Sequence, residues 1–222
     1  MSPKYYEAYE ERYKTIHARG VSWSSNQSTP IVMEMLKKYN ILLNAPVLEI
    51  GCGEGRDAKA VLECGFNLLA TDISAEAVRY CQAVLPQHQD HFQILDCLSD
   101  NPDKKFDFIY AIAVIHMLIL DDDRNRFYHF IADHLTSNGV ALICTMGDGN
   151  TEMQRDITEA FTLQRRNHES GPIFVAGTSC RMVSFETFIV ELQRNGLHII
   201  ESGITASPPD FNSLMYAIVE NS

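Results

Sequence analysis

The chain contains 222 residues, and its 18 Lys and Arg against 29 Asp and Glu give a formal net charge of −11 at pH 7. Its 45 % hydrophobic content is that of an ordinary globular protein, and the length is enough for one α/β domain with a full core. The acidic balance argues against a nucleic-acid partner, because nucleic-acid binders carry a basic stripe that displaces counterions from phosphate. A neutral or cationic small molecule fits this charge better, although an electropositive pocket inside an acidic protein stays open.

Targeting and metal signals are absent from the sequence. No apolar run reaches the ~18 residues that a membrane-spanning helix needs. Met1–Tyr13 is charged and aromatic rather than a signal peptide. The six cysteines have no C-x-x-C spacing, which suits reduced thiols better than disulfides or a zinc site. We therefore expect a cytoplasmic protein with no membrane contact and no metal, of unknown oligomeric state.

The first 44 residues contain a tyrosine-rich stretch and the single tryptophan, Trp23. A second helix is expected over Ile31–Tyr39, with Thr29 as N-cap and Pro30 at its first position. The tyrosines either close a helical lid over an active site or only attach a terminal helix to the sheet. Trp23 stands in a Ser-rich stretch that core packing does not require, so we predict that it contacts the substrate.

A strand at Val47–Ile50 leads into a glycine loop, and a helix is expected over Asp57–Glu63. Gly51, Gly53 and Gly55 permit positive φ and the close approach of a ligand to bare backbone. Asp72 follows at about the ~20-residue distance of a nucleotide-binding βαβ unit. Glu49 and Glu54 would repel a pyrophosphate but favour a cofactor with an amino group and a sulfonium.

Three further strands carry polar residues at or just after their ends. The stretch from Asn67 ends in Asp72, before a helix over Ala75–Val84 that Ser74 caps. Phe92–Cys97 ends in Asp96, and Phe106–Leu118 contains His116. No Asn-Pro-Pro-Tyr sequence follows the fourth strand.

These motifs, over residues 45–145, resemble those of the class I S-adenosylmethionine-dependent methyltransferases. Within that resemblance, the missing Asn-Pro-Pro-Tyr sequence argues against methylation of N6-adenine or a glutamine amide. The resemblance implies an α/β fold: a Rossmann-like three-layer sandwich with a seven-stranded, mostly parallel sheet whose last strand is antiparallel. The cofactor S-adenosyl-L-methionine is then expected to lie on ten residues: the methionine end on Glu49, Gly51, Cys52, Gly53 and Gly55, the ribose on Asp72, the adenine on Ile73, Asp96 and Cys97, and a further contact at Ala111.

The remaining elements are expected to complete the sheet and cover the substrate. A helix over Asp123–Leu135, closed by Asn138-Gly139, precedes a strand at Val140–Thr145. Ser184 caps a helix ending at Arg194, and strands at Leu197–Ile204 and Leu214–Glu220 flank a Pro208-Pro209 turn. Residues 147–183 exceed an ordinary connection, so we predict a lid insertion with a helix over Glu152–Arg166. Its candidate substrate contacts are Arg165, Arg166, His168, Phe174 and Arg181.

We predict one methyltransferase domain over residues 1–222, with a lid at 1–44, a cofactor core at 45–146, the insertion at 147–183 and a helix and strand pair at 184–222. The expected reaction is methyl transfer to a small-molecule acceptor with release of S-adenosylhomocysteine. His116 is either a general base or a structural histidine. The alternatives are a protein or RNA methyltransferase, a non-catalytic S-adenosylmethionine binder and a nicotinamide dehydrogenase.

Overall fold

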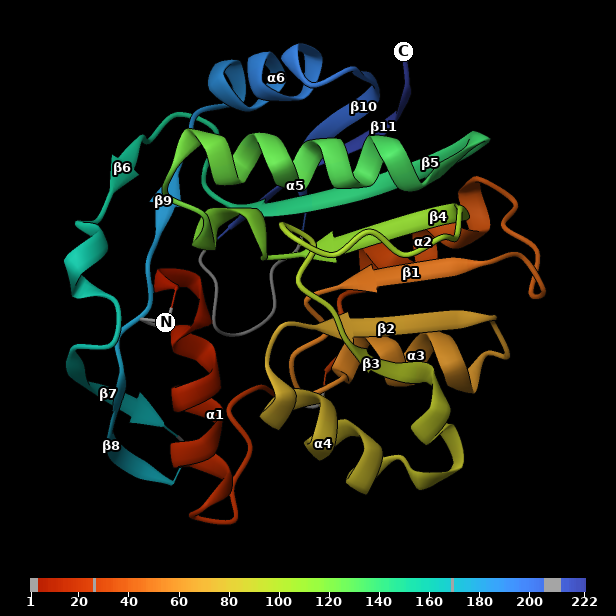
Figure 1. The fold of residues 1–222 in the computed structure, drawn as a ribbon. Coiled ribbons are helices and arrows are strands. Elements are labelled where there is room, and N and C mark those ends of the chain that lie inside the picture. The colour runs from red at the N-terminus through yellow and green to blue at the C-terminus, as the bar shows by residue number, and fades with distance from the viewer. Residues whose placement is uncertain (1–3, 26, 169, 206–212) are drawn as a thin grey trace.

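A computed structural model describes residues 4–25, 27–168, 170–205 and 213–222 (Figure 1). Within them, seven strands form the main sheet. In chain order these are β1 (Val47–Ile50), β2 (Leu68–Asp72), β3 (Phe92–Ile94), β4 (Phe106–Ile112), β5 (Leu135–Met146), β10 (Leu197–Thr205) and β11 (Leu214–Asn221).

The spatial order of the strands is β10-β11-β5-β4-β1-β2-β3. The five strands from β5 to β3 run parallel, whereas β11 lies antiparallel between β5 and β10. The predicted fold class is confirmed, including the antiparallel last strand.

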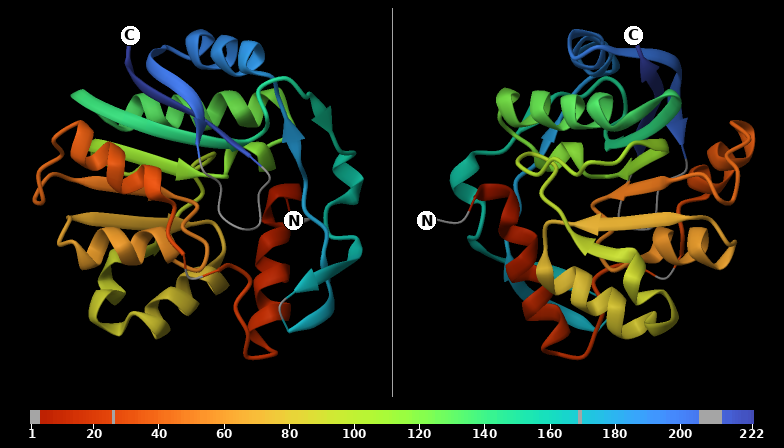
Figure 2. Two further views of the ribbon diagram at one scale, coloured as in Figure 1. Left: turned by 180° about the vertical axis from the view of Figure 1, so that it is seen from behind. Right: turned by 45° about the vertical axis from the view of Figure 1, so that its right-hand side comes forward.

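Helices cover both faces of this sheet (Figures 1 and 2). The apolar side chains of α2 (Pro30–Lys38), α3 (Arg56–Glu63) and α4 (Ala75–Val84) form one core with one face of the strands. Those of α5 (Asp121–His134) and α6 (Phe185–Arg194) form a second core with the other face. Neighbouring strand residues such as Val47 and Leu48 belong to opposite cores, because successive side chains of a strand point to opposite faces.

Local sequence signals place most of these elements within one or two residues. Ser74 and Ser184 cap α4 and α6 by accepting hydrogen bonds from Ala77 N and Thr187 N. Thr29 precedes α2 as expected, but its hydroxyl donates to the Asp57 carboxylate instead of capping. Asn138-Gly139 does not close α5; it lies inside β5, which starts directly after that helix. The Pro208-Pro209 turn lies outside the described residues.

The predicted helix over Glu152–Arg166 is wrong. The insertion instead contains β6 (Met153–Gln154), the short helix η4 (Ile157–Glu159), β7 (Leu163–His168), β8 (Gly171–Ala176) and β9 (Arg181–Met182). β7 and β8 form an antiparallel hairpin, and β6 pairs with β9. Exposed and half-buried residues alternate along β7, as in a strand with one covered face, and this tertiary cover overrides the helix propensity.

The N-terminal helix α1 (Ala8–His17), which follows the short helix η1 (Tyr5–Glu7), packs on this hairpin. Ile16 forms a small core with Ile173 and Val175, beside Val21 and Trp23. Figure 2 shows α1 and the hairpin side by side beyond the carboxyl ends of the parallel strands. The remaining short helices are η2 (Pro86–His91) and η3 (Ile115–Met117). No helix in the described part of the chain is both long and apolar enough to cross a membrane.

Candidate active site

A cavity of about 610 Å³ lies between the carboxyl edge of the sheet and the cover made by α1 and the insertion. The carboxyl edge contributes β1, the glycine loop, Asp72 and Asp96, while the cover contributes Trp23 and Thr178 among others. Ligands of open parallel sheets bind at this edge, where the strand order reverses.

The glycine loop adopts the backbone that its sequence predicts. Gly51, Gly53 and Gly55 have φ values of 73°, 54° and 77°. A Cβ on Gly51 would lie 2.5 Å from Val114 Cγ2, and one on Gly53 would lie 2.8 Å from the Tyr13 hydroxyl. Gly51, Cys52 and Gly53 line the cavity, whereas Gly55 is the N-cap of α3 and does not line it.

Asp72 ends β2 and faces the loop. Its two oxygens accept 2.8 Å hydrogen bonds from Gly53 N and Ser74 N, which fixes the carboxylate in position. Only 8 % of the residue is exposed, and burial raises the pKa of the carboxyl above its ordinary value. Because each carboxylate oxygen has further lone pairs, Asp72 can also accept hydrogen bonds from hydroxyls in the cavity.

The predicted adenine residues Ile73, Asp96 and Cys97 also line the cavity. Asp96 accepts hydrogen bonds from Lys4 Nζ at 2.7 Å and from Leu98 N at 2.9 Å. The carboxylate is thereby held in place, and the N-terminal segment contacts this end of the cavity.

Glu49 is the most buried acid of the cavity, at 2 % exposure. The Tyr110 hydroxyl donates to it at 3.0 Å. Burial, and next the negative charge of Asp57, raise the pKa of Glu49 well above its ordinary value. A cationic ligand would relieve this penalty, so the site fits a cofactor that carries an ammonium and a sulfonium.

Glu54 ties the N-terminal segment to the loop. It accepts hydrogen bonds from Trp23 N at 2.7 Å, Ser24 N at 2.6 Å and Ser24 Oγ at 2.8 Å, and lies 2.9 Å from His17 Nε2. The carboxylate that the sequence places beside the cofactor is thus largely engaged by this segment.

His116 lies on η3, directly after β4, and lines the cavity. It is 3 % exposed, and burial, followed by the positive charge of Arg124, lowers its pKa to about 4. The imidazole is therefore neutral at physiological pH.

The six predicted substrate contacts lie in different places in the structure. Arg166 lines the cavity, whereas Arg165 is exposed and does not. Trp23 lines the cavity, but His168 lines only a neighbouring groove, with its ring nitrogens 2.7 Å from Ser22 O and 2.8 Å from Ser170 Oγ. Phe174 is 53 % exposed and is not among the residues lining the cavity.

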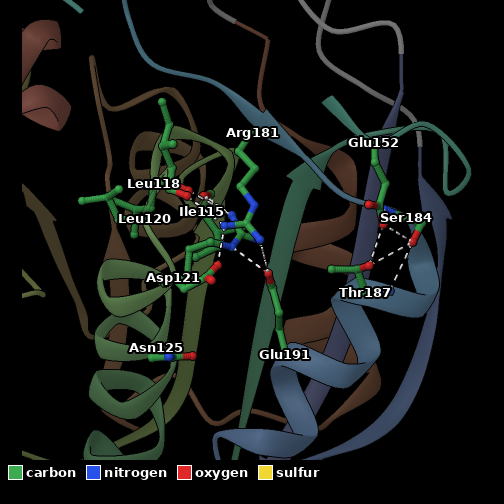
Figure 3. Close-up of polar contacts among 12 residues, drawn as sticks. Ile115, Leu118, Leu120, Asp121, Asn125, Glu152, Arg181, Ser184, Thr187 and Glu191 are labelled. Atoms are coloured by element: carbon green, nitrogen blue, oxygen red, sulfur yellow. Dashed lines mark hydrogen bonds and ion pairs between the residues drawn. The ribbon is translucent and has the colours of Figure 1, made fainter. Parts of the chain in front are cut away.

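Arg181 anchors β9 instead of facing the cavity. It donates to Ile119 O at 2.8 Å and to Asp121 at 2.6 Å, and lies 3.6 Å from Glu191 on α6 (Figure 3). These placements are at odds with substrate roles for Phe174 and Arg181. Ala111, a predicted cofactor contact, is 1 % exposed inside β4 and does not line the cavity.

Sequence reasoning missed several cavity residues. Tyr6, Tyr9 and Tyr13 recur at spacings of three and four, the period of one helix face, and this signal would have singled them out. Arg12, Arg155, Thr178 and Ser179 carry no such pattern, because the fold alone brings them to the cavity. Arg166, a candidate substrate contact from the sequence, does line the cavity.

Residues 48–141 match the family model described as a methyltransferase domain. Two similar curated proteins are ubiquinone biosynthesis O-methyltransferases. That of Rickettsia conorii is 24 % identical over 53 % of this chain and 40 % of its own length. That of Rickettsia prowazekii is 25 % identical over 52 % of this chain and 46 % of its own length. The chain thus spans about half the length of the curated relatives it matches.

Solved structures share the fold over nearly the whole chain. An S-adenosylmethionine-dependent methyltransferase from Clostridium acetobutylicum superposes with a TM-score of 0.66 at 17 % identity, covering 98 % of this chain and 99 % of that one. The CcbJ methyltransferase from Streptomyces caelestis gives 0.70 at 12 % identity, covering 99 % and 98 %. The glycopeptide N-methyltransferase MtfA, complexed with S-adenosylmethionine, gives 0.65 at 18 % identity, covering 88 % of each chain.

The fold and the family match together define a Rossmann-like methyltransferase domain. Residues 48–141 thus match a methyltransferase domain, and the chain has the fold of solved S-adenosylmethionine-dependent methyltransferases.

Proposed function

We propose that this protein transfers a methyl group from S-adenosylmethionine to a small-molecule acceptor and releases S-adenosylhomocysteine. The observation that carries the proposal is the cavity itself, which continues from the glycine loop and Asp72 to the cover formed by α1 and the insertion. Its volume of about 610 Å³ lies within the ordinary range of small-molecule sites.

The residue roles are assigned from placement and charge. Asp72 is proposed to accept hydrogen bonds from the ribose, and Ile73, Asp96 and Cys97 to bound the adenine. Glu49 and the backbone of Gly51–Gly53 would hold the methionine end. These residues orient the cofactor, whose sulfonium supplies an activated methyl group.

The cover would exclude water and position the acceptor. Trp23 stays our proposed acceptor contact, because it lines the cavity. His116 stays a candidate base, since it is neutral and lines the same cavity. Its pKa of about 4 makes it a weak base, so it suits an acceptor that loses its proton easily, such as a phenol or a thiol.

The names of the similar proteins indicate different acceptor atoms. The curated relatives are named O-methyltransferases, whereas MtfA is named an N-methyltransferase. A hydroxyl acceptor is our first choice because the curated relatives agree on it, and an amine acceptor is the second.

Calorimetric titration with S-adenosylhomocysteine, run beside NAD, tests the cofactor assignment. We expect micromolar binding of the first and none of the second. Purified protein is then incubated with S-adenosylmethionine and a panel of phenols, amines and thiols, and S-adenosylhomocysteine release is measured. Binding of NAD alone contradicts the proposal, and cofactor binding without turnover of any acceptor favours a non-catalytic binder.

A further inference from the structure

The cover side of the cavity concentrates positive charge in an otherwise acidic chain. Arg12 from α1 and Arg155 and Arg166 from the insertion all line the cavity. Within the described residues none of the three has a carboxylate within ion-pair distance, although Arg56, Arg79, Arg124 and Arg181 all do.

Arg12 is held rigidly and is 3 % exposed. Its Nε and Nη2 donate to Ala176 O at 3.1 and 2.9 Å, and Nη2 also donates to Thr178 Oγ1 at 3.3 Å. Its guanidinium carbon lies 4.7 Å from the Tyr9 ring centroid and 4.6 Å from that of Trp23.

Arg166 lies on the covered face of β7, where half-buried residues alternate with exposed ones such as Arg165. Its Nη2 donates to Gln164 Oε1 at 2.9 Å, whereas its buried Nε has no hydrogen-bond partner among the described residues. Burial lowers the pKa of Arg12, and the nearby charge of Arg166 acts in the same direction. The two guanidinium groups therefore repel each other in the free protein.

Arg155 and Arg166 both lie near Cys180, a further residue lining the cavity. Burial raises the pKa of the Cys180 thiol, while the charges of Arg155 and Arg166 both lower it. Arg12 is buried, whereas Arg155 and Arg166 are half-buried. Cations without a counter-charge in such places are costly, and a bound anion would reduce both the desolvation penalty and the repulsion.

The acidic residues of the cavity lie along the carboxyl edge of the sheet and in the glycine loop: Glu49, Glu54, Asp57, Asp72 and Asp96. Of these, Glu54 also reaches the cover, where Trp23 N and Ser24 donate to it. The cavity thus has an acidic end that suits the cationic groups of the cofactor and a basic end on the cover.

We propose, on the basis of the proposed function above, that the methyl acceptor carries an oxyanion, a carboxylate or a phosphate, which binds Arg12, Arg155 and Arg166. This reverses the expectation from net charge, which favoured a neutral or cationic substrate. The single tryptophan stacks on Arg12 and so reports binding at this end of the cavity.

The test is a Trp23 fluorescence titration at fixed ionic strength, with and without saturating S-adenosylhomocysteine. Benzoate is compared with benzamide, its neutral analogue, and inorganic phosphate is titrated separately to distinguish the two oxyanions. We expect saturable binding of benzoate or phosphate, and benzamide binding at least about tenfold weaker than benzoate if benzoate binds.

Substitutions at Arg166 and Arg165 test where the oxyanion binds. Arg166→Gln should weaken oxyanion binding about tenfold, Arg166→Lys should restore part of it, and the neighbouring exposed Arg165→Gln should leave it unchanged. Thermal unfolding of each variant checks that the fold is intact.

Three results would overturn the proposal: no response to either oxyanion, equal binding of benzoate and benzamide, or an Arg166→Gln variant that loses S-adenosylhomocysteine affinity. The last would assign the arginines to the carboxylate of the cofactor. Calorimetry of the wild type with S-adenosylhomocysteine tests the proposed function separately. The oxyanion titrations without cofactor can be interpreted whatever that calorimetry shows.

Discussion

Asp72 combines two roles in one carboxylate, because it fixes the glycine loop through Gly53 N and also faces the cavity. Asp72→Asn keeps the shape but removes the charge that accepts the proposed ribose hydrogen bonds. We expect S-adenosylhomocysteine to bind about 1–3 kcal/mol more weakly, or roughly 5- to 150-fold, by calorimetry. Asp90→Asn, an exposed change on η2, is the matched control. Unchanged affinity in Asp72→Asn would remove the ribose assignment.

The raised pKa of Glu49 predicts that cofactor binding is coupled to the release of a proton. Its raised pKa favours the protonated form in the free protein, whereas a cationic ligand favours the ionised form. Binding should therefore release protons, and affinity should rise with pH until Glu49 is ionised in the free protein. Calorimetry in two buffers of different ionisation enthalpy should give different apparent enthalpies. Glu49→Gln should abolish the difference, and equal enthalpies in the wild type would contradict the prediction.

The raised pKa of Glu49 also predicts that the free energy of unfolding depends on pH. A carboxyl whose pKa is raised by folding destabilises the folded state as pH rises above the ordinary value of 4.5. Glu49→Gln should therefore unfold at higher urea concentration than the wild type at pH 8, by at least about 1 kcal/mol, and show a smaller gain at pH 5. A gain that does not grow with pH would point to a cause other than ionisation.

At the scale of elements, two attachments of the cover can be tested separately. Glu54 holds residues 22–25 through hydrogen bonds to backbone and hydroxyl groups, and the hairpin attaches to α1 through Ile16, Ile173 and Val175. Neither of these two attachments involves the main sheet, so each can loosen locally without global unfolding.

Glu54→Gln should loosen the N-terminal segment alone. Neutralising the acceptor weakens three hydrogen bonds, and bonds to charged groups contribute about 1.5–3 kcal/mol each. We expect hydrogen exchange at Trp23 and Ser24 to accelerate at least about tenfold, with little change in the sheet. Glu63→Gln, on the exposed end of α3, should change neither. Equal exchange rates in Glu54→Gln and the wild type would refute the attachment.

The hairpin offers a paired comparison at adjacent positions. Val175 is fully buried, while Phe174 is 53 % exposed on the opposite face of β8. Val175→Ala should destabilise the cover by about 1–3 kcal/mol, seen as faster exchange across β7 and β8. Phe174→Ala should change neither exchange nor methyl transfer. A large loss of turnover in Phe174→Ala would reinstate Phe174 as a substrate contact.

At the scale of the whole molecule, one ion pair joins α5, α6 and the loop that carries His116. Arg124 donates to Glu191 at 2.9 and 2.6 Å and to the carbonyl oxygens of Ile115 and Leu118. Figure 3 shows Glu191 also facing Arg181 of β9, so one carboxylate couples the second core to the cover.

Glu191→Gln should therefore destabilise the whole fold. It leaves the buried Arg124 guanidinium without a counter-charge, a change that costs about 3 kcal/mol or more. Urea denaturation should show the loss, and the exposed Glu186→Gln on the same helix should show none. If the two variants unfold at the same urea concentration, the pair is not a determinant of stability.

The sequence by itself determined the parts of this protein that depend on local patterns. The strand Val47–Ile50, the glycines of positive φ and the capping serines of α4 and α6 depend on neighbouring residues alone, and each is confirmed. The order of the sheet followed from the resemblance that these motifs carry. The cofactor side of the cavity was predictable for the same reason, since its residues stand at strand ends.

Only the tertiary structure decided the acceptor side. Arg165 and Arg166 are equivalent in sequence, but the period of β7 sends one to solvent and the other to the cavity. Arg181 is indistinguishable from them until the fold gives it Asp121 as a partner. Residues 152–166 became strands and turns because pairing with β8 and β9 outweighed helix propensity. Contacts between segments more than a hundred residues apart, such as Arg12 with Ala176, have no local signal, because they depend on how the whole chain packs.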